Sequence, residues 1–328
     1  MKRKYVTEYS FGYMNSLTVM VTAHQLMQGG VMRPDDEENL SNCHIYFIAA
    51  RPLPYFKQGS IKHYNKKLSG ILCYKIDGHE FEIPFADYPW ELSKDVVNIE
   101  LKYPYREVVS YKENGEVETL VPASFLANLY IPIIVEGSPL NQYEILYIGQ
   151  ALGQGSRSAA DRLKRHETLQ KILALSSYEY PDKEIMLFMF EFEHDQMFTS
   201  MDGRAKDADN SGENETRLIN AMKNPPNKKQ KIGMIEAGFI RYFQPHYNEI
   251  FKIKFPSSKH KVLQSCIDLD VTGLILELDT SDLRCKLYSL AATVSDHHIA
   301  KLDLTSQQNR LSFFHITGIG ALPGVISG

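Results

Sequence analysis

A single glutamate, Glu236, interrupts an apolar stripe in a segment with helical periodicity, residues 231–243. Each residue of an α-helix advances by about 100°, which places Ile232, Phe239 and Ile240 within about 60° of Glu236. An ionised carboxylate in such a stripe is costly unless it pairs with a cation or binds a metal ion. Glu236 is therefore either held by a structural Arg or Lys or is a candidate metal ligand.

A second candidate pair, Arg162 and His166, lies in a helix predicted for residues 158–175. Their i, i+4 spacing places the two side chains one turn apart on the inward face, where Leu169 and Leu173 continue the stripe. A guanidinium and an imidazole at the edge of a core indicate a site for an anion or a proton transfer. The alternative is an arginine whose head reaches solvent beside a structurally satisfied histidine.

Two tyrosines in predicted strands precede that helix. Tyr130 opens an apolar segment, residues 130–135, and Tyr147 lies in the segment 144–148. With these residues the central part of the chain resembles the GIY-YIG nuclease superfamily. Tyr147-Ile148-Gly149 matches the second half of the family signature, and Asn128-Leu129-Tyr130 keeps the tyrosine of its first half. The family's later elements follow in order, namely Arg162 and His166 on the first helix, Glu236 on a later helix, and Asn248 twelve residues beyond it.

The resemblance implies a metal-dependent endonuclease that hydrolyses phosphodiester bonds. Glu236 would hold one Mg²⁺ (or Mn²⁺), an ion that prefers oxygen ligands, and Arg162 would bind the phosphate oxygens through its forked donors. Tyr130 would orient the attacking water and pass its proton to His166, because a phenol with a pKa of about 10 is a poor base alone. Tyr147 would position the water or the phosphate.

The roles of two asparagines, Asn128 and Asn248, are less well defined by the sequence. Asn248 either fixes the glutamate or the phosphate by a hydrogen bond or closes the turn after Pro245. Asn128 stands where the family has a glycine that permits close backbone approach, so it puts the strand register in question.

The elements that would position these residues predict an α+β fold. Residues 120–255 form the expected GIY-YIG-like domain, a small three-stranded antiparallel sheet with helices, including a strand at 185–192 and an exposed polar insertion at 207–215. Residues 1–119 form a β-rich region with hairpins at Asp77-Gly78 and Asn114-Gly115, a possible recognition domain. Residues 256–328 form a second β-rich region, with strands at 274–278 and 299–304, that could pack with the first.

The composition is that of a globular protein with a core, since 43% of residues are hydrophobic and 23% charged. We expect a cytoplasmic location, because the chain has no apolar run long enough to span a bilayer, no recognisable secretion signal and no Cys-x-x-Cys pair among its four cysteines. A net charge of −4 excludes coating of nucleic acid by bulk electrostatics. The expected partner is double-stranded DNA, whose binding therefore depends on local basic patches at 57–67, 157–171, 223–231 and 252–261. The sequence is also compatible with a homo-oligomer.

Three other interpretations of the sequence have less support. Gly149, Gly153 and Gly155 precede a helix, but no Gly-Lys-Ser/Thr follows to complete a nucleotide phosphate loop. The pairs His297-His298 and Cys43-His44 are adjacent residues that point in different directions, which favours surface or core positions over a metal site. The alternative function is a catalytically silent nucleic-acid-binding or protein-interaction module, which has no need for a carboxylate in an apolar stripe.

Overall fold

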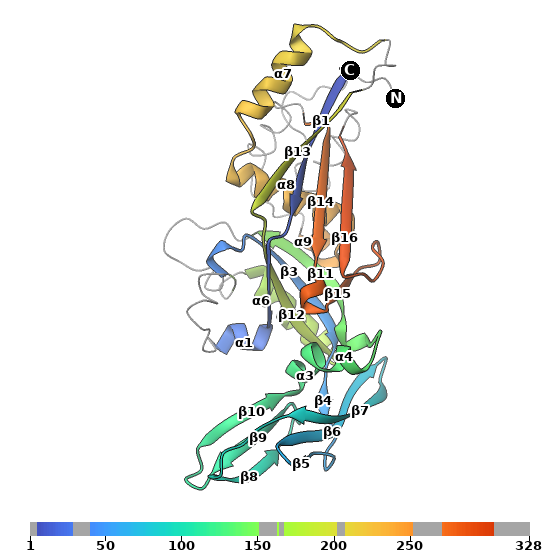
Figure 1. Cartoon of the computed structure of the whole chain (residues 1–328). Coiled ribbons are helices and arrows are strands. Elements are labelled where there is room, and N and C mark those ends of the chain that lie inside the picture. The colour runs from blue at the N-terminus through green and yellow to red at the C-terminus, as the bar shows by residue number, and fades with distance from the viewer. Residues whose placement is uncertain are drawn as a thin grey trace.

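The structure, a computed structural model, describes residues 5–28, 40–150, 163, 167–201, 207–251 and 271–304. It has an α+β fold whose sheets follow one another along an elongated molecule (Figure 1). No helix in these ranges is long and apolar enough to cross a membrane.

The central sheet has five strands in the order β15-β11-β3-β12-β2. Its neighbours are antiparallel except β11 and β15, which run parallel. The strands are β2 (Leu17–Thr22), β3 (Ile45–Pro52), β11 (Gln142–Gln150), β12 (Lys183–Glu191) and β15 (Lys286–Tyr288). β3 lies in the middle and is buried from Ile45 to Arg51, because both faces of the sheet are covered.

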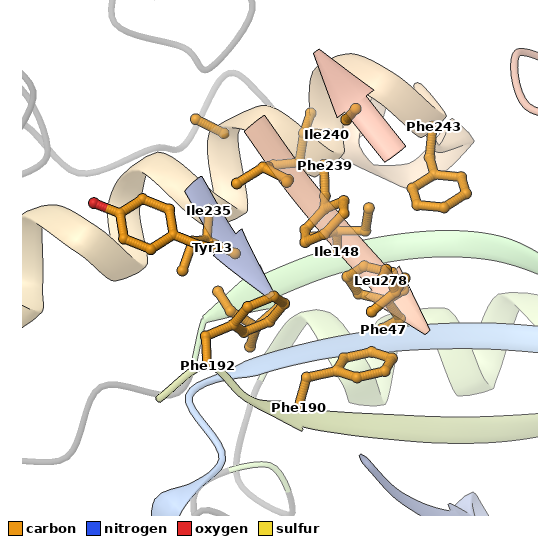
Figure 2. Packing of buried hydrophobic residues seen from close by; sticks show 14 of the residues in the cluster. Tyr13, Phe47, Ile148, Phe190, Phe192, Ile235, Phe239, Ile240, Phe243 and Leu278 are labelled. Carbon is orange, nitrogen blue, oxygen red and sulfur yellow. The ribbon is translucent and has the colours of Figure 1, made fainter. Parts of the chain in front are cut away.

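Helices cover the central sheet on both sides. On one face, α8 (Lys228–Phe243) brings Phe239 and Phe243 against Phe47 of β3, with ring centroids 5.6 and 5.8 Å apart (Figure 2). On the other face, α1 (Ala23–Gln28) and α6 (Glu167–Glu179) join a separate core cluster that contains Tyr46 and Tyr147. α9 (His246–Phe251) follows α8 and contributes Tyr247 to that second cluster.

A second sheet packs on the far side of α8, in the order β13-β1-β14-β16. It consists of β1 (Thr7–Met14), β13 (His194–Met201), β14 (Gly273–Asp279) and β16 (His297–Asp303). A Cβ on Gly238 would lie 2.4 Å from a methyl group of Leu276, so α8 sits very close to β14. α7 (Gly212–Lys223) contacts β1, and the short η3 (Ser281–Leu283) precedes β15.

Residues 53–141 form a β-rich body between β3 and β11, at one end of the molecule (Figure 1). We call it the inserted body. Its strands are β4 (Tyr55–Phe56), β5 (Lys62–Tyr64), β6 (Lys67–Ile76), β7 (His79–Pro89), β8 (Val96–Leu101), β9 (Glu107–Lys112) and β10 (Val117–Pro122). Helices α3 (Ala123–Leu129) and α4 (Ile131–Ile134) and the turn η1 (Pro139–Asn141) return the chain to the central sheet.

Several predicted elements are confirmed. The hairpin at Asp77-Gly78 joins β6 to β7 with positive φ at both turn residues, and β9 and β10 flank Asn114-Gly115. The strands at 144–148, 185–192, 274–278 and 299–304 correspond to β11, β12, β14 and β16. The helix at 232–243 is α8, which begins earlier because Asn227 and Gln230 form a capping box.

The predicted strand at 130–135 is wrong, because α4 occupies residues 131–134 of this segment, directly after the end of α3. Pro132 lies in the first turn of α4, where its missing N–H costs nothing. The predicted three-stranded sheet is in fact five-stranded. Of the helix expected at 158–175, residue 163 and residues from 167 onward are helical, and the others lie outside the described residues.

The central sheet takes strands from all three predicted segments. β2 and β3 come from residues 1–119, β11 and β12 from 120–255, and β15 from 256–328. The expected association of the two ends is present, since β1 pairs in parallel with β14. Part of the exposed polar insertion expected at 207–215 is the first turn of α7, which Ser211 caps through a hydrogen bond from the Glu213 amide.

Candidate functional site around Gly149

Glu236 is only 4% exposed, in the middle of the buried face of α8. Its inward orientation is as the helical periodicity predicted. Its carboxylate oxygen Oε2 accepts a hydrogen bond of 2.9 Å from Nε2 of Gln150, the last residue of β11. This bond ties the helix carboxylate to the end of the strand that carries Tyr147-Ile148-Gly149.

Tyr147 is buried, and its ring lies 6.0 Å from that of Tyr46 on the neighbouring strand β3. The two strands are antiparallel, with Gly149 opposite Tyr46. Tyr46 is only 1% exposed and was not among the residues predicted from the sequence. The structure therefore brings a second tyrosine to Tyr147, from a strand nearly a hundred residues earlier in the chain.

Gly149 leaves room for both tyrosines. A Cβ at this position would lie 2.5 Å from the Tyr46 hydroxyl oxygen and 2.8 Å from the Tyr147 ring. These distances are shorter than any real carbon contact, so the approach of both side chains requires a residue without a side chain. We call Tyr46, Tyr147, Gly149, Gln150 and Glu236 the Gly149 cluster.

The pKa of Tyr46 reflects how closely Tyr147 and Glu236 approach its hydroxyl. Burial, the nearby Tyr147 and the negative charge of Glu236, together with a hydrogen bond to Tyr147, raise the pKa of Tyr46 well above its ordinary value. Tyr46 therefore keeps its proton at neutral pH. A protonated phenol can donate and accept hydrogen bonds but is a poor base.

Asn248 has a role that the sequence did not predict. Its side chain donates to the carbonyl oxygen of Ile148 and accepts from the Ile148 amide, both at 2.8 Å. It thus pairs like a neighbouring strand with β11, between Tyr147 and Gly149, and these two bonds do not involve Glu236. Its backbone amide donates to the Pro245 carbonyl, as the turn-closing alternative required.

Tyr130 lies apart from the Gly149 cluster, between α3 and α4. Its hydroxyl donates to the Ala86 carbonyl, and its ring lies 5.4 Å from Tyr88 in the core of the inserted body. Asn128 accepts hydrogen bonds from Arg51 and from the Tyr143 hydroxyl. The structure therefore does not bring Tyr130 together with Tyr147 and Glu236.

The predicted residues Arg162 and His166 lie outside the described residues. The adjacent helical residues Leu163 and Leu169 are buried in the same cluster as Tyr46 and Tyr147. The start of this helix therefore packs on the face of the sheet that carries both tyrosines.

The oxygen atoms around Glu236 suit a hard divalent cation. Besides the carboxylate, the carboxamide oxygen Oε1 of Gln150 is buried and accepts no hydrogen bond within the described part of the chain. Carboxylate and amide oxygens are the ligands that Mg²⁺ takes in proteins. The Glu236 carboxylate is the group that would hold such an ion here.

The other histidine and cysteine candidates have structural surroundings. His298 is buried, and its Nε2 lies 3.0 Å from each of two backbone carbonyl oxygens; burial lowers its pKa. His297 contacts Glu277 at 2.7 Å on the surface. Burial raises the pKa of the Cys43 thiol to about 12, which makes it a poor nucleophile. Cys73, Glu80 and Glu82 lie close together on the inserted body, but Glu82 pairs with Lys57 at 2.6 Å.

In the sequence Tyr46 follows Ile45, and Ile-Tyr resembles the end of the Gly-Ile-Tyr tripeptide in the GIY-YIG signature. This resemblance was missed because β3 lies almost a hundred residues before Tyr147. Comparisons of the chain with protein-family models, curated proteins and solved structures give no match.

Proposed function

We propose that this chain is a metal-dependent endonuclease of the GIY-YIG type that hydrolyses phosphodiester bonds in DNA. The observation that carries the proposal is the convergence of Tyr46, Tyr147 and Glu236 around Gly149, from β3, β11 and α8. A glutamate in an apolar helix face, two buried phenols and a glycine that admits them form a set that a purely structural core does not need.

In this proposal Tyr46 takes the place that the sequence assigned to Tyr130. His44-Ile45-Tyr46 supplies the first half of the signature on β3, and Tyr147-Ile148-Gly149 supplies the second half on the paired strand β11. Histidine then stands where the family has its first glycine. The inserted body is a long insertion between the two signature strands.

The chain's own groups would divide the chemistry as follows. Tyr46 and Tyr147 orient the attacking water and a phosphate oxygen through their hydroxyl groups. Because Tyr46 holds its proton at neutral pH, it accepts a proton from water only while passing its own to a base, for which His166 stays the candidate. Arg162 stays the candidate for the phosphate oxygens.

Glu236 would hold Mg²⁺ or Mn²⁺, which, when bound, neutralises charge on the phosphate and assists the leaving oxygen. Asn248 positions the site by fixing Ile148 from the open side of β11. The inserted body and the second sheet are the parts left to recognise DNA. A role in restriction, defence or repair fits such an arrangement.

The proposal is tested by incubating the protein with a mixed-sequence pool of DNA duplexes, with Mg²⁺ or with EDTA, and sequencing the ends produced. We expect cleavage that requires the metal ion and falls by at least about 100-fold in Glu236→Ala and in Tyr46→Phe, since positioned groups of this kind contribute roughly 10²–10⁴-fold. Tyr130→Phe should cleave within about twofold of the parent, because it loses one hydrogen bond worth about 1 kcal/mol remote from the cluster.

Glu167→Ala is the matched control for Glu236→Ala. Its side chain is exposed at the start of α6 and forms an i, i+4 surface pair with Lys171, a kind of pair that contributes little, so its loss should leave cleavage unchanged. Equal cleavage by the parent and Glu236→Ala would reject hydrolysis at this site and favour the silent binding module. Loss of activity in Tyr130→Phe with full activity in Tyr46→Phe would reject the assignment of Tyr46.

A further inference from the structure

Gln150 ends β11 beside Glu236, and the two ends of its carboxamide differ in their surroundings. The nitrogen Nε2 donates to Glu236 Oε2 at 2.9 Å. The oxygen Oε1 is buried and receives no hydrogen bond from any described residue. Buried amide oxygens almost always have a donor, and leaving one without a donor is unfavourable.

This oxygen and the Glu236 carboxylate lie within reach of one small ion. Oε1 and Nε2 share one carbon atom, and Nε2 already touches the carboxylate. A half-turn about the last bond of the side chain exchanges oxygen and nitrogen within the same space. In either orientation the carboxamide stays next to Glu236, because the strand end that carries it is fixed by the pairing of Gln150 with Ile45.

We propose that Gln150 is the second protein ligand of the cation held by Glu236, through Oε1. The proposal rests on the proposed nuclease function, which requires a cation at Glu236. That function names the Glu236 carboxylate as the ligand and gives Gln150 no part in binding the ion. In the absence of the ion, the Nε2 hydrogen bond compensates the buried negative charge of Glu236. With the ion present, the amide oxygen replaces that hydrogen bond with a bond to the metal.

The alternative role for Gln150 is a hydrogen bond to Glu236 and nothing more, and the two roles predict opposite effects on metal affinity. A ligand oxygen adds affinity, so its removal weakens binding. A hydrogen bond to the carboxylate competes with the metal for the same oxygen, so its removal leaves binding unchanged or makes it tighter.

The test measures binding of Mn²⁺ to the full-length protein without DNA, by electron paramagnetic resonance of the free ion. Gln150→Leu removes both polar atoms at similar size, and we expect its Kd to rise by roughly 10-fold or more, since loss of a group that supports a metal site typically costs 10–100-fold. Gln150→Glu supplies an oxygen with a full charge, and we expect its Kd to fall. Gln142→Leu is the control. Gln142 lies on the same strand, and within the described residues its side chain donates a hydrogen bond only to the Gly137 carbonyl.

The outcomes separate this inference from the proposed function. Binding that is lost in Glu236→Gln but unchanged or tighter in Gln150→Leu keeps the metal site and overturns the role of Gln150. No binding of Mn²⁺ by the parent overturns both. Circular dichroism of each variant shows whether it is folded, and weaker binding in Gln150→Glu would also overturn the proposal, even if Gln150→Leu fails to fold.

Discussion

At the scale of single residues, Gly149 decides whether the side chains of Tyr46 and Tyr147 can pack over the backbone at the end of β11. The Tyr46 hydroxyl and the Tyr147 ring occupy the space that a side chain at this position would fill. Neither tyrosine can move aside easily, because both are buried in a packed cluster. The glycine is therefore required by the close approach of side chains, not by a turn.

We predict that Gly149→Ala displaces Tyr46 and reduces cleavage of DNA by at least about 100-fold, since small displacements in a site cost that much. The overpacking should also lower the free energy of unfolding by about 1–3 kcal/mol. Cleavage assays and urea titrations measure the two effects.

Gly212→Ala is the control for this change. A Cβ at Gly212, the first residue of α7, would meet no atom within 4 Å, so alanine should be neutral or slightly stabilising. Full activity of Gly149→Ala would show that the tyrosines tolerate displacement and would remove the argument for their close packing.

At the scale of elements, β3 joins the candidate site to the inserted body. Tyr46 lies at one end of the strand, and Arg51 lies fully buried at the other. Arg51 donates to Glu184 Oε2 from Nε at 3.0 Å and from Nη2 at 2.7 Å. It also donates to the carbonyl oxygens of Ser124 and Leu140, which belong to the inserted body. The arginine thus links two strands of the central sheet to the insertion.

We predict that Arg51→Met lowers the free energy of unfolding by about 3–5 kcal/mol, because it leaves the carboxylate of Glu184 partly buried without its cation. Urea unfolding measures this effect. Lys183 lies beside Glu184 on β12 and forms a partly exposed pair with Glu144 of β11, so Lys183→Met should cost no more than about 1 kcal/mol. Similar losses for the two variants would contradict a special role of the buried arginine.

At the scale of the whole molecule, the inserted body and the central sheet border an open hollow of about 420 Å³. It lies between the end of β2, the start of α1 and the loop that joins β8 to β9. Lys102, Tyr103 and Arg106 of that loop line it together with Glu100, Glu107 and Glu184; Lys102 pairs with Glu100, and Tyr103 is 84% exposed. Basic and aromatic side chains together are typical of surfaces that contact nucleic acid.

We predict that Arg106→Ala weakens binding of DNA and reduces the slope of log K against log salt concentration by about 1, as expected for one lost phosphate contact. Fluorescence anisotropy at several salt concentrations measures both. Lys94→Ala removes an exposed charge of the inserted body that does not line the hollow, and it should change neither quantity. Equal effects of the two variants would exclude a specific contact at the hollow.

The sequence alone determined the features that depend on neighbours along the chain. The hairpin at Asp77-Gly78 follows from two residues that accept positive φ, and the inward position of Glu236 follows from the 3.6-residue period of α8. The strand at Tyr147-Ile148-Gly149 was predicted for the same local reasons. These features need no knowledge of the rest of the fold.

Only the tertiary structure decided which tyrosine accompanies Tyr147. β3 is covered on both faces and therefore lacks the alternation of polar and apolar residues that marks a half-buried strand. Its pairing with β11 spans the whole inserted body, and no local pattern encodes a contact at that separation. Tyr130, nearer in sequence, instead packs inside the inserted body, because α3 and α4 turn it toward Ala86 and Tyr88. Strand pairing across a long insertion is fixed by the burial of the whole sheet, and so the site could be completed only in three dimensions.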